Sequence, residues 1–236
     1  MHRSGDKLIR ALGLGLSLFL CLGCSGGPFA ELAGLNPWIW KKWEEDERYG
    51  PTFHRRLAEL KSLQANASRL SPDERQGFAQ QLVELVQNDP HPFLRAEAVK
   101  AMAKLSTPAV LPGLRAAAAD TDPLVRAAAC RAWGGVGDAE ALHVLGDLAT
   151  RDADVDVRVA ATGELGRFRD QAAVQALGLV LNDNDPAVQY QAVKSLKSAT
   201  GRDLGDSVAV WRDYVAGRAP LPERSPSLVE RFRSLF

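Results

Sequence analysis

Side chains that commonly carry catalysis or bind metal ions are few and scattered in this sequence. The four histidines stand at positions 2, 54, 91 and 143, and none is followed by glutamate, so the metalloprotease motif H-E-x-x-H is absent. Gly134-Gly135-Val136-Gly137 follows an expected helix rather than a strand, which favours a helix end over a phosphate-binding loop. We therefore predict no catalytic residue and no cofactor.

Three aspartates alternate along one stretch and could suggest a calcium site. Asp152, Asp154 and Asp156 would supply carboxylate oxygens, which Ca²⁺ prefers. A calcium-binding loop, however, places glycine at its sixth position and glutamate at its twelfth, where this chain has Val157 and Gly163. The cluster therefore predicts a capped turn between two helices and no metal site.

A five-residue pattern, Asp122-Pro123-Leu124-Val125-Arg126, recurs along the chain and indicates the framework that positions the other residues. Its last position is Arg95, Arg126, Arg158 and Gln189 in successive copies, at intervals of 31, 32 and 31 residues. A period of this size is typical of proteins built from stacked repeats.

Mostly apolar positions within each copy follow a helical spacing. Three residues after the repeated position the chain has alanine every time, at 98, 129, 161 and 192. The residues one before, four after and seven after the repeated position, together with these alanines, form one face of an α-helix. The sequence predicts helical hairpins over 105–119 with 123–136, 138–150 with 155–168, and 170–182 with 186–199.

An aspartate precedes the second helix of each of these three hairpins. Asp122, Asp154 and Asp185 are expected to cap these helices by accepting backbone N–H groups. His91, which holds the equivalent position in the first copy, is a weaker cap. These residues have a structural role.

The repeated arginines can connect one copy of the pattern to the next. We expect Arg95, Arg126 and Arg158 to bond an aspartate of their own or of the adjacent repeat and so form a ladder. Gln189 breaks this ladder in the last copy. We expect the second hairpin, where the pattern is complete, to be the firmest part.

The eight residues from Asp122 to Ala129, the helix end at Leu165-Gly166 and the helix start at 138–142 resemble the HEAT repeat family. The likeness is to the short variant also found in phycobilin lyases, over about residues 72–217. It implies an all-α fold, a right-handed α-solenoid of about four HEAT-like helical hairpins with N-terminal helices and a C-terminal capping helix. It also implies a non-enzymatic scaffold that binds other proteins. The alternative is a phycobilin-lyase-like protein that handles a small-molecule chromophore.

The first residues have the features of an export signal. Residues 1–10 carry three basic side chains, and Ala11 to Leu22 form an apolar run. A transmembrane helix needs about 20 apolar residues, so this run is short for one. The sequence predicts a signal peptide over residues 1–23.

The pair Gly23-Cys24 resembles the lipobox of bacterial lipoproteins. The resemblance implies that Cys24 is lipidated and begins the mature chain, which would then be attached to the extracytoplasmic face of a bacterial membrane. Cys21 stands where the family usually has leucine. Modification of Cys21 and a plain cleaved signal remain as alternatives.

The rest of the chain divides by composition. We expect a tether over 24–35, N-terminal helices over 36–70, the repeat domain over 71–217, and a Pro-rich tail with a short amphipathic segment over 218–236. Trp38, Trp40 and Trp43 form a possible interface: they could cap the first repeat, lie at the membrane surface or contact a partner.

Charge argues against a nucleic-acid partner. The chain has 29 basic and 29 acidic side chains, and without residues 1–23 it has 26 and 28. Proteins that bind nucleic acid usually show a basic excess. We therefore expect a membrane contact through the lipid and a protein partner whose identity the sequence does not give.

Overall fold

The computed structural model describes residues 50–218. The expected signal peptide, Cys24, the tether, the three tryptophans at 38, 40 and 43 and almost all of the tail lie outside these residues. The chain divides into a unit up to Arg55 and a second unit from Arg56 onward, and the repeats belong to the second. No helix in the described part is long and apolar enough to cross a membrane.

The described residues form α-helices joined by short turns, with no strand among residues 50–218. The helices are α3 (Phe53–Asn66), α4 (Pro72–Asn88), α5 (Pro92–Leu105), α6 (Leu111–Ala118), α7 (Pro123–Val136), α8 (Ala139–Arg151), α9 (Val155–Leu165), α10 (Gln171–Val180), α11 (Pro186–Thr200) and α12 (Val208–Val215). Single 3-10 turns at Ala67–Arg69 and Pro108–Val110 follow α3 and precede α6. The prediction of an all-α solenoid is confirmed.

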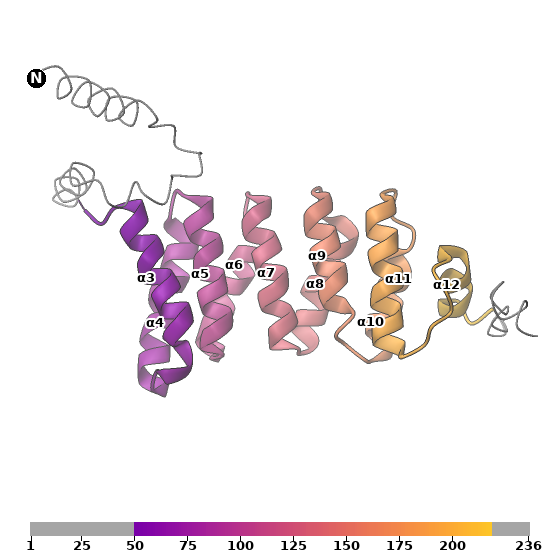
Figure 1. Cartoon of the computed structure of the whole chain (residues 1–236), viewed down its shortest axis with the longest axis horizontal. Coiled ribbons are helices and arrows are strands. Elements are labelled where there is room, and N and C mark those ends of the chain that lie inside the picture. Colours follow the sequence, from indigo (N-terminus) through magenta and orange to yellow (C-terminus); the bar gives the residue numbers. More distant parts are fainter. Residues whose placement is uncertain (1–49, 219–236) are drawn as a thin grey trace, which may run out of the picture. The chain divides into compact units, whose positions relative to one another are not determined.

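Four hairpins stack along the repeat unit, pairing α4 with α5, α6 with α7, α8 with α9, and α10 with α11. The second helices of the hairpins, α5, α7, α9 and α11, pack against one another in order and form one row (Figure 1). The first helices, α4, α6, α8 and α10, lie behind them in the same view. One side of every second helix therefore faces away from its hairpin partner.

The repeated alanines explain how closely these rows pack. Ala98, Ala129, Ala161 and Ala192 are fully buried, and a larger side chain at these positions would push neighbouring helices apart. A glycine does the same at the end of α9, because a Cβ on Gly166 would lie only 2.9 Å from the Cα of Ser195 in α11. Small residues thus set the spacing from one repeat to the next.

Two helix boundaries differ by three or more residues from those predicted. Leu105 ends α5 rather than beginning the next helix, and Pro108 opens a 3-10 turn, so α6 starts only at Leu111. Proline lacks a backbone N–H and is accepted at the start of a helix rather than inside it. At the other boundary α9 ends at Leu165, before Gly166, and Phe168 lies buried in the following turn.

Candidate functional site

Arg126 of α7 joins two consecutive repeats. Its Nε and Nη2 donate to Oδ2 and Oδ1 of Asp152, at 2.7 and 2.8 Å, across the boundary to the next hairpin. Its Nη1 donates to the carbonyl oxygen of Asp120, at 2.9 Å, in the turn that precedes its own helix. One guanidinium therefore fixes its own turn and the following turn at the same time.

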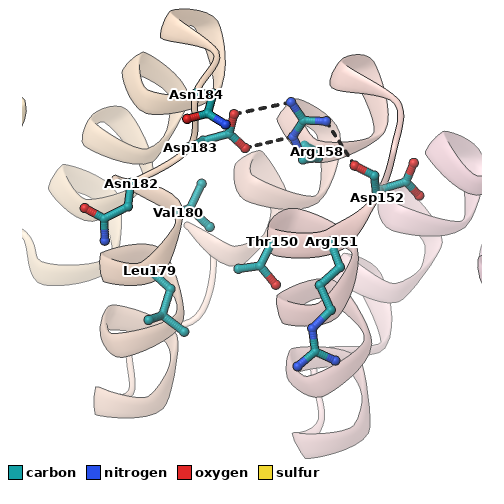
Figure 2. A pocket seen from close by; sticks show the side chains of 9 residues that line it. All are labelled: Thr150, Arg151, Asp152, Arg158, Leu179, Val180, Asn182, Asp183 and Asn184. Atoms are coloured by element: carbon teal, nitrogen blue, oxygen red, sulfur yellow. Dashed lines mark hydrogen bonds and ion pairs between the residues drawn. The ribbon is translucent and has the colours of Figure 1, made fainter.

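The same arrangement recurs in the neighbouring repeats. Arg95 donates two hydrogen bonds of 2.7 Å to the carboxylate of Asp120. Arg158 donates to the carboxylate of Asp183, at 2.8 and 3.3 Å. Figure 2 shows the Arg158 guanidinium between the turns that hold Asp152 and Asp183. We call the pairs Arg95–Asp120, Arg126–Asp152 and Arg158–Asp183 the Arg–Asp clasps.

The aspartates of the clasps are not the capping aspartates. Asp122 accepts the backbone N–H of Leu124 at 2.8 Å, and Asp185 accepts that of Ala187 at 2.8 Å. Asp154 accepts the N–H groups of residues 156 and 157, at 2.9 and 3.2 Å. His91 makes no such capping bond with its side chain. In each of these turns, one aspartate caps the helix and a different aspartate pairs with the arginine.

Sequence reasoning missed the residues that pair with the arginines, although a signal was present. Each clasp aspartate stands two residues before the cap of its turn, in the pattern D-x-D. Its Oδ1 also accepts the N–H of the capping residue, as Asp152 does from residue 154 at 2.9 Å. The spacing of 120, 152 and 183 follows the repeat period and could have identified them.

Electrostatics favour the ionised clasps. Burial raises the pKa of the Asp152 carboxyl, but hydrogen bonds from Arg126 and from the backbone of Asp154 outweigh it, so its pKa lies below the ordinary value. The side chain of Asp152 is only 4% exposed and that of Arg126 15%. The hydrogen bond to Asp152 raises the pKa of Arg126. Asp120 and Asp183 have lowered pKa values for the corresponding reasons.

The cysteine and histidines of the described residues do not gather at one site. Cys130, the cysteine within residues 50–218, is buried, and burial raises the pKa of its thiol to about 12. His54, His91 and His143 are exposed on separate elements. No group of three metal-ligating side chains is found in the part of the chain that the structure describes. A buried thiol with a raised pKa is not activated as a nucleophile.

A pocket of about 360 Å³ lies beside the third clasp, between the turns that follow α8 and α10. Figure 2 labels its lining: Thr150, Arg151, Asp152, Arg158, Leu179, Val180, Asn182, Asp183 and Asn184. Asp152, Arg158 and Asp183 are already bound in clasps, and Arg151 pairs with Asp147 at 3.1 Å. The charged groups that line this pocket are therefore already paired, some with residues outside it.

A second pocket, of about 300 Å³, is more apolar. It lies where α5 and α7 end and α6 begins, and Met102, Leu111, Leu114 and Val136 contribute to its lining. No pattern in the sequence pointed to it, because these residues come from three helices that only the fold brings together.

The outward side of the second helices differs from the clasped edge, because its side chains vary from repeat to repeat. Leu124 and Tyr190 are 46% and 57% exposed there. Lys100, Arg131 and Lys194 are exposed on α5, α7 and α11. We call this outward side of the second helices the second-helix face. It also includes Val159 of α9 and Arg167, which follows α9.

Comparison with known proteins agrees with this architecture. The sequence matches the family described as HEAT repeats over residues 79–155 and 143–210, which together cover more than half of the chain. No curated protein matches the chain. The repeat period, the stacked hairpins and the family match lead to one conclusion: the chain belongs to the HEAT repeat family.

Proposed function

We propose that the protein is a non-enzymatic scaffold that binds a protein partner while anchored by lipid to the extracytoplasmic face of a bacterial membrane. HEAT repeats commonly mediate protein–protein interaction. The observation that carries the scaffold proposal is the contrast within each second helix. The clasp and alanine positions repeat, whereas the exposed positions two residues before each clasp residue or its equivalent hold Phe93, Leu124, Asp156 and Ala187. A constant framework with a variable exposed face is the arrangement a recognition surface requires.

Photocrosslinking in intact cells tests the scaffold role. A photoreactive amino acid is placed at Tyr190 on the second-helix face, and a matched one at Gln175 on α10, a first helix. A scaffold gives protein adducts of discrete mass from at least one of these positions. Illumination that yields no adduct from either would contradict the proposal.

The membrane anchor rests on the apolar run that ends at Gly23-Cys24. A buried acyl chain contributes roughly 0.8 kcal/mol per methylene, so lasting attachment needs more than one chain. Cells that express Cys24→Ser are fed a labelled fatty acid. We expect this variant to lose the label and the membrane-bound fraction.

The neighbouring cysteine provides the control for this experiment. Cys21→Ser keeps both the label and the membrane-bound fraction if Cys24 is the modified residue. The reverse outcome assigns the lipid to Cys21, and labelling of neither protein leaves a plain cleaved signal.

Chromophore handling of the phycobilin-lyase type is the second candidate. The observation in its favour is the apolar pocket of about 300 Å³ between α5, α6 and α7. This volume lies at the lower end of the range for small-molecule sites, which favours the scaffold. Co-expression with a bilin separates the two proposals, because only the lyase-type function produces a coloured complex.

A further inference from the structure

The second-helix face carries a row of positive charge with one cation from each repeat. Lys100, Arg131 and Lys194 occupy equivalent positions in the first, second and fourth repeats. The third repeat has Gly163 at this position and places Arg167 four residues later, in the turn after α9. Because adjacent helices lie about 8–10 Å apart, the four cations form a band about 25–30 Å long.

Two members of this row have no carboxylate partner. Lys100 pairs with Glu97 at 2.6 Å, and Arg167 pairs with Glu164 at 3.0 Å. The side chain of Arg131 is exposed and makes no hydrogen bond or ion pair with any described residue.

Lys194 has an aromatic contact instead, since its Nζ lies 5.7 Å from the centre of the Tyr190 ring. Arg131 and Lys194 thus keep their positive charges available to a ligand. Asp156 is the exposed acidic residue of α9 near the apolar end of the face.

The first helices have the opposite balance. Their acidic residues are Asp73, Glu74, Glu84, Glu140 and Asp147. Their three basic residues are Arg75, Arg115 and Arg151, and Arg115 and Arg151 pair with Glu140 and Asp147. The near-zero charge of the whole chain therefore conceals an uneven distribution between the two rows of helices.

Apolar side chains run beside the cations, toward the start of each second helix. Leu124 lies seven residues before Arg131, and Tyr190 lies four before Lys194, which correspond to about 10 and 6 Å along a helix. Val159 of α9 is half-buried and lies between them in the row. An apolar strip next to a basic band calls for a ligand that offers both apolar side chains and negative charge.

Building on the proposed scaffold function, we propose that the second-helix face binds an acidic segment of a partner protein, with apolar side chains interspersed among its carboxylates. The carboxylates pair with Arg131 and Lys194, and the apolar side chains cover Leu124, Val159 and Tyr190. An extended chain of about nine residues is long enough to cross the four helices.

A protein segment fits this face better than a polyphosphate or a lipid surface. Binding to nucleic acid neutralises several phosphates at once, whereas only two cations here are unpaired by carboxylates. Glu97, Asp156 and Glu164 lie among the cations and would repel a dense array of phosphates. A peptide can place its carboxylates between these acids.

Fluorescence anisotropy with the full-length protein tests the proposal. The probe is a labelled peptide of about twelve residues in which glutamate and aspartate are interspersed with leucine and phenylalanine. The comparison peptide has glutamine and asparagine at the acidic positions. We expect the acidic peptide to bind about tenfold more tightly, and the advantage to shrink as salt rises.

Charge reversal locates the binding site. R131E/K194E is expected to weaken binding of the acidic peptide by about tenfold or more. R151E/R169E makes the same change in net charge at exposed positions outside the second-helix face and should alter binding by less than about twofold. Leu124→Ser should weaken binding by about threefold, and thermal melting checks that every variant is folded.

Several outcomes would overturn the proposal. These are equal affinity for the two peptides, unchanged binding by R131E/K194E, or tighter binding to duplex DNA or to vesicles rich in phosphatidylglycerol than to the acidic peptide. If the acidic peptide fails to bind while photocrosslinks from α10 persist, the proposal for the second-helix face is wrong. The scaffold proposal is then unaffected. Absence of crosslinks from every position would count against the scaffold itself.

Discussion

The junction between the central repeats and the last junction of the solenoid are held by different means. Arg126 bonds its own turn through the carbonyl of Asp120 and the following turn through the carboxylate of Asp152. Gln189, at the equivalent position, donates one hydrogen bond of 2.6 Å to the carbonyl of Asp183 in its own turn. The glutamine thus keeps the half of the clasp that lies within a repeat and loses the half that links repeats.

The helix after this junction is held by a buried tryptophan and by one hydrogen bond to the preceding repeat. Trp211 of α12 is fully buried and donates from Nε1 to the carbonyl of Gly205 at 3.0 Å. Arg212 donates to the carbonyl of Leu181, while its Nε is buried without a hydrogen-bond partner in the structure. An unpaired buried N–H costs free energy, so we expect the end of the solenoid to be less stable than its centre.

Asp152→Ala should give the largest effect, because three N–H groups lose their acceptor: two of Arg126 and the backbone of Asp154. We expect unfolding in urea to become easier by about 3 kcal/mol. Asp156→Ala, an exposed change in the same stretch, should cost less than about 1 kcal/mol. An equal loss in the free energy of unfolding for the two variants would contradict a stabilising role of the clasp.

Arg126→Ala should follow, with a loss of about 1–3 kcal/mol in the free energy of unfolding. The matched control is Arg131→Ala on the same helix, which should change stability by less than about 0.5 kcal/mol. The double variant with Asp152→Ala should cost less than the sum of the single changes, because both remove one interaction. Additive losses would mean that the two residues act independently.

Gln189→Ala should have a smaller effect, about 0.5–1.5 kcal/mol, since a single hydrogen bond to a carbonyl is lost. Gln189→Arg should restore little, because Tyr214, 31 residues after Asp183, stands where the next clasp aspartate would be. Urea unfolding measures both variants. A stabilisation by Gln189→Arg similar to the cost of Arg126→Ala would show that some other acceptor is within reach.

Acid should weaken the clasped part through its carboxyls. Asp120, Asp152 and Asp183 have pKa values below the ordinary range in the folded protein. Their contribution is complete above the unfolded pKa of about 3.9 and is lost as the pH falls through the folded pKa. The stability difference between the wild type and Asp152→Asn should therefore shrink between about pH 5 and pH 2. A constant difference would contradict this origin.

Residues that act within one turn or one helix were readable from the sequence. The period of the pattern predicted the hairpins, and the aspartate at position 122 stood where helix caps are favoured. The partner of Arg126 was harder to identify, because Asp152 lies 26 residues away and belongs to a different turn. The start of α6 was misplaced because an apolar, alanine-rich stretch outweighed the two prolines at 108 and 112.

The second-helix face could not be foreseen for a different reason. Its cations are separated by about a repeat each, and the total charge of the chain is zero. Only the stacking of α5, α7, α9 and α11 into one row (Figure 1) brings together the helices that carry Arg131 and Lys194. In the net charge of the chain, these cations are offset by acidic residues of the first helices, which form the other row.

Hydrogen exchange measured by mass spectrometry tests most directly whether the cross-repeat clasps set the stability of each junction. We expect amides of α7 and α9 to exchange more slowly than those of α11 and α12 in the wild type. In Arg126→Ala, protection of α7 and α9 should fall toward that of α11 and α12. Equal protection of both regions in the wild type, or unchanged protection in the variant, would contradict the account.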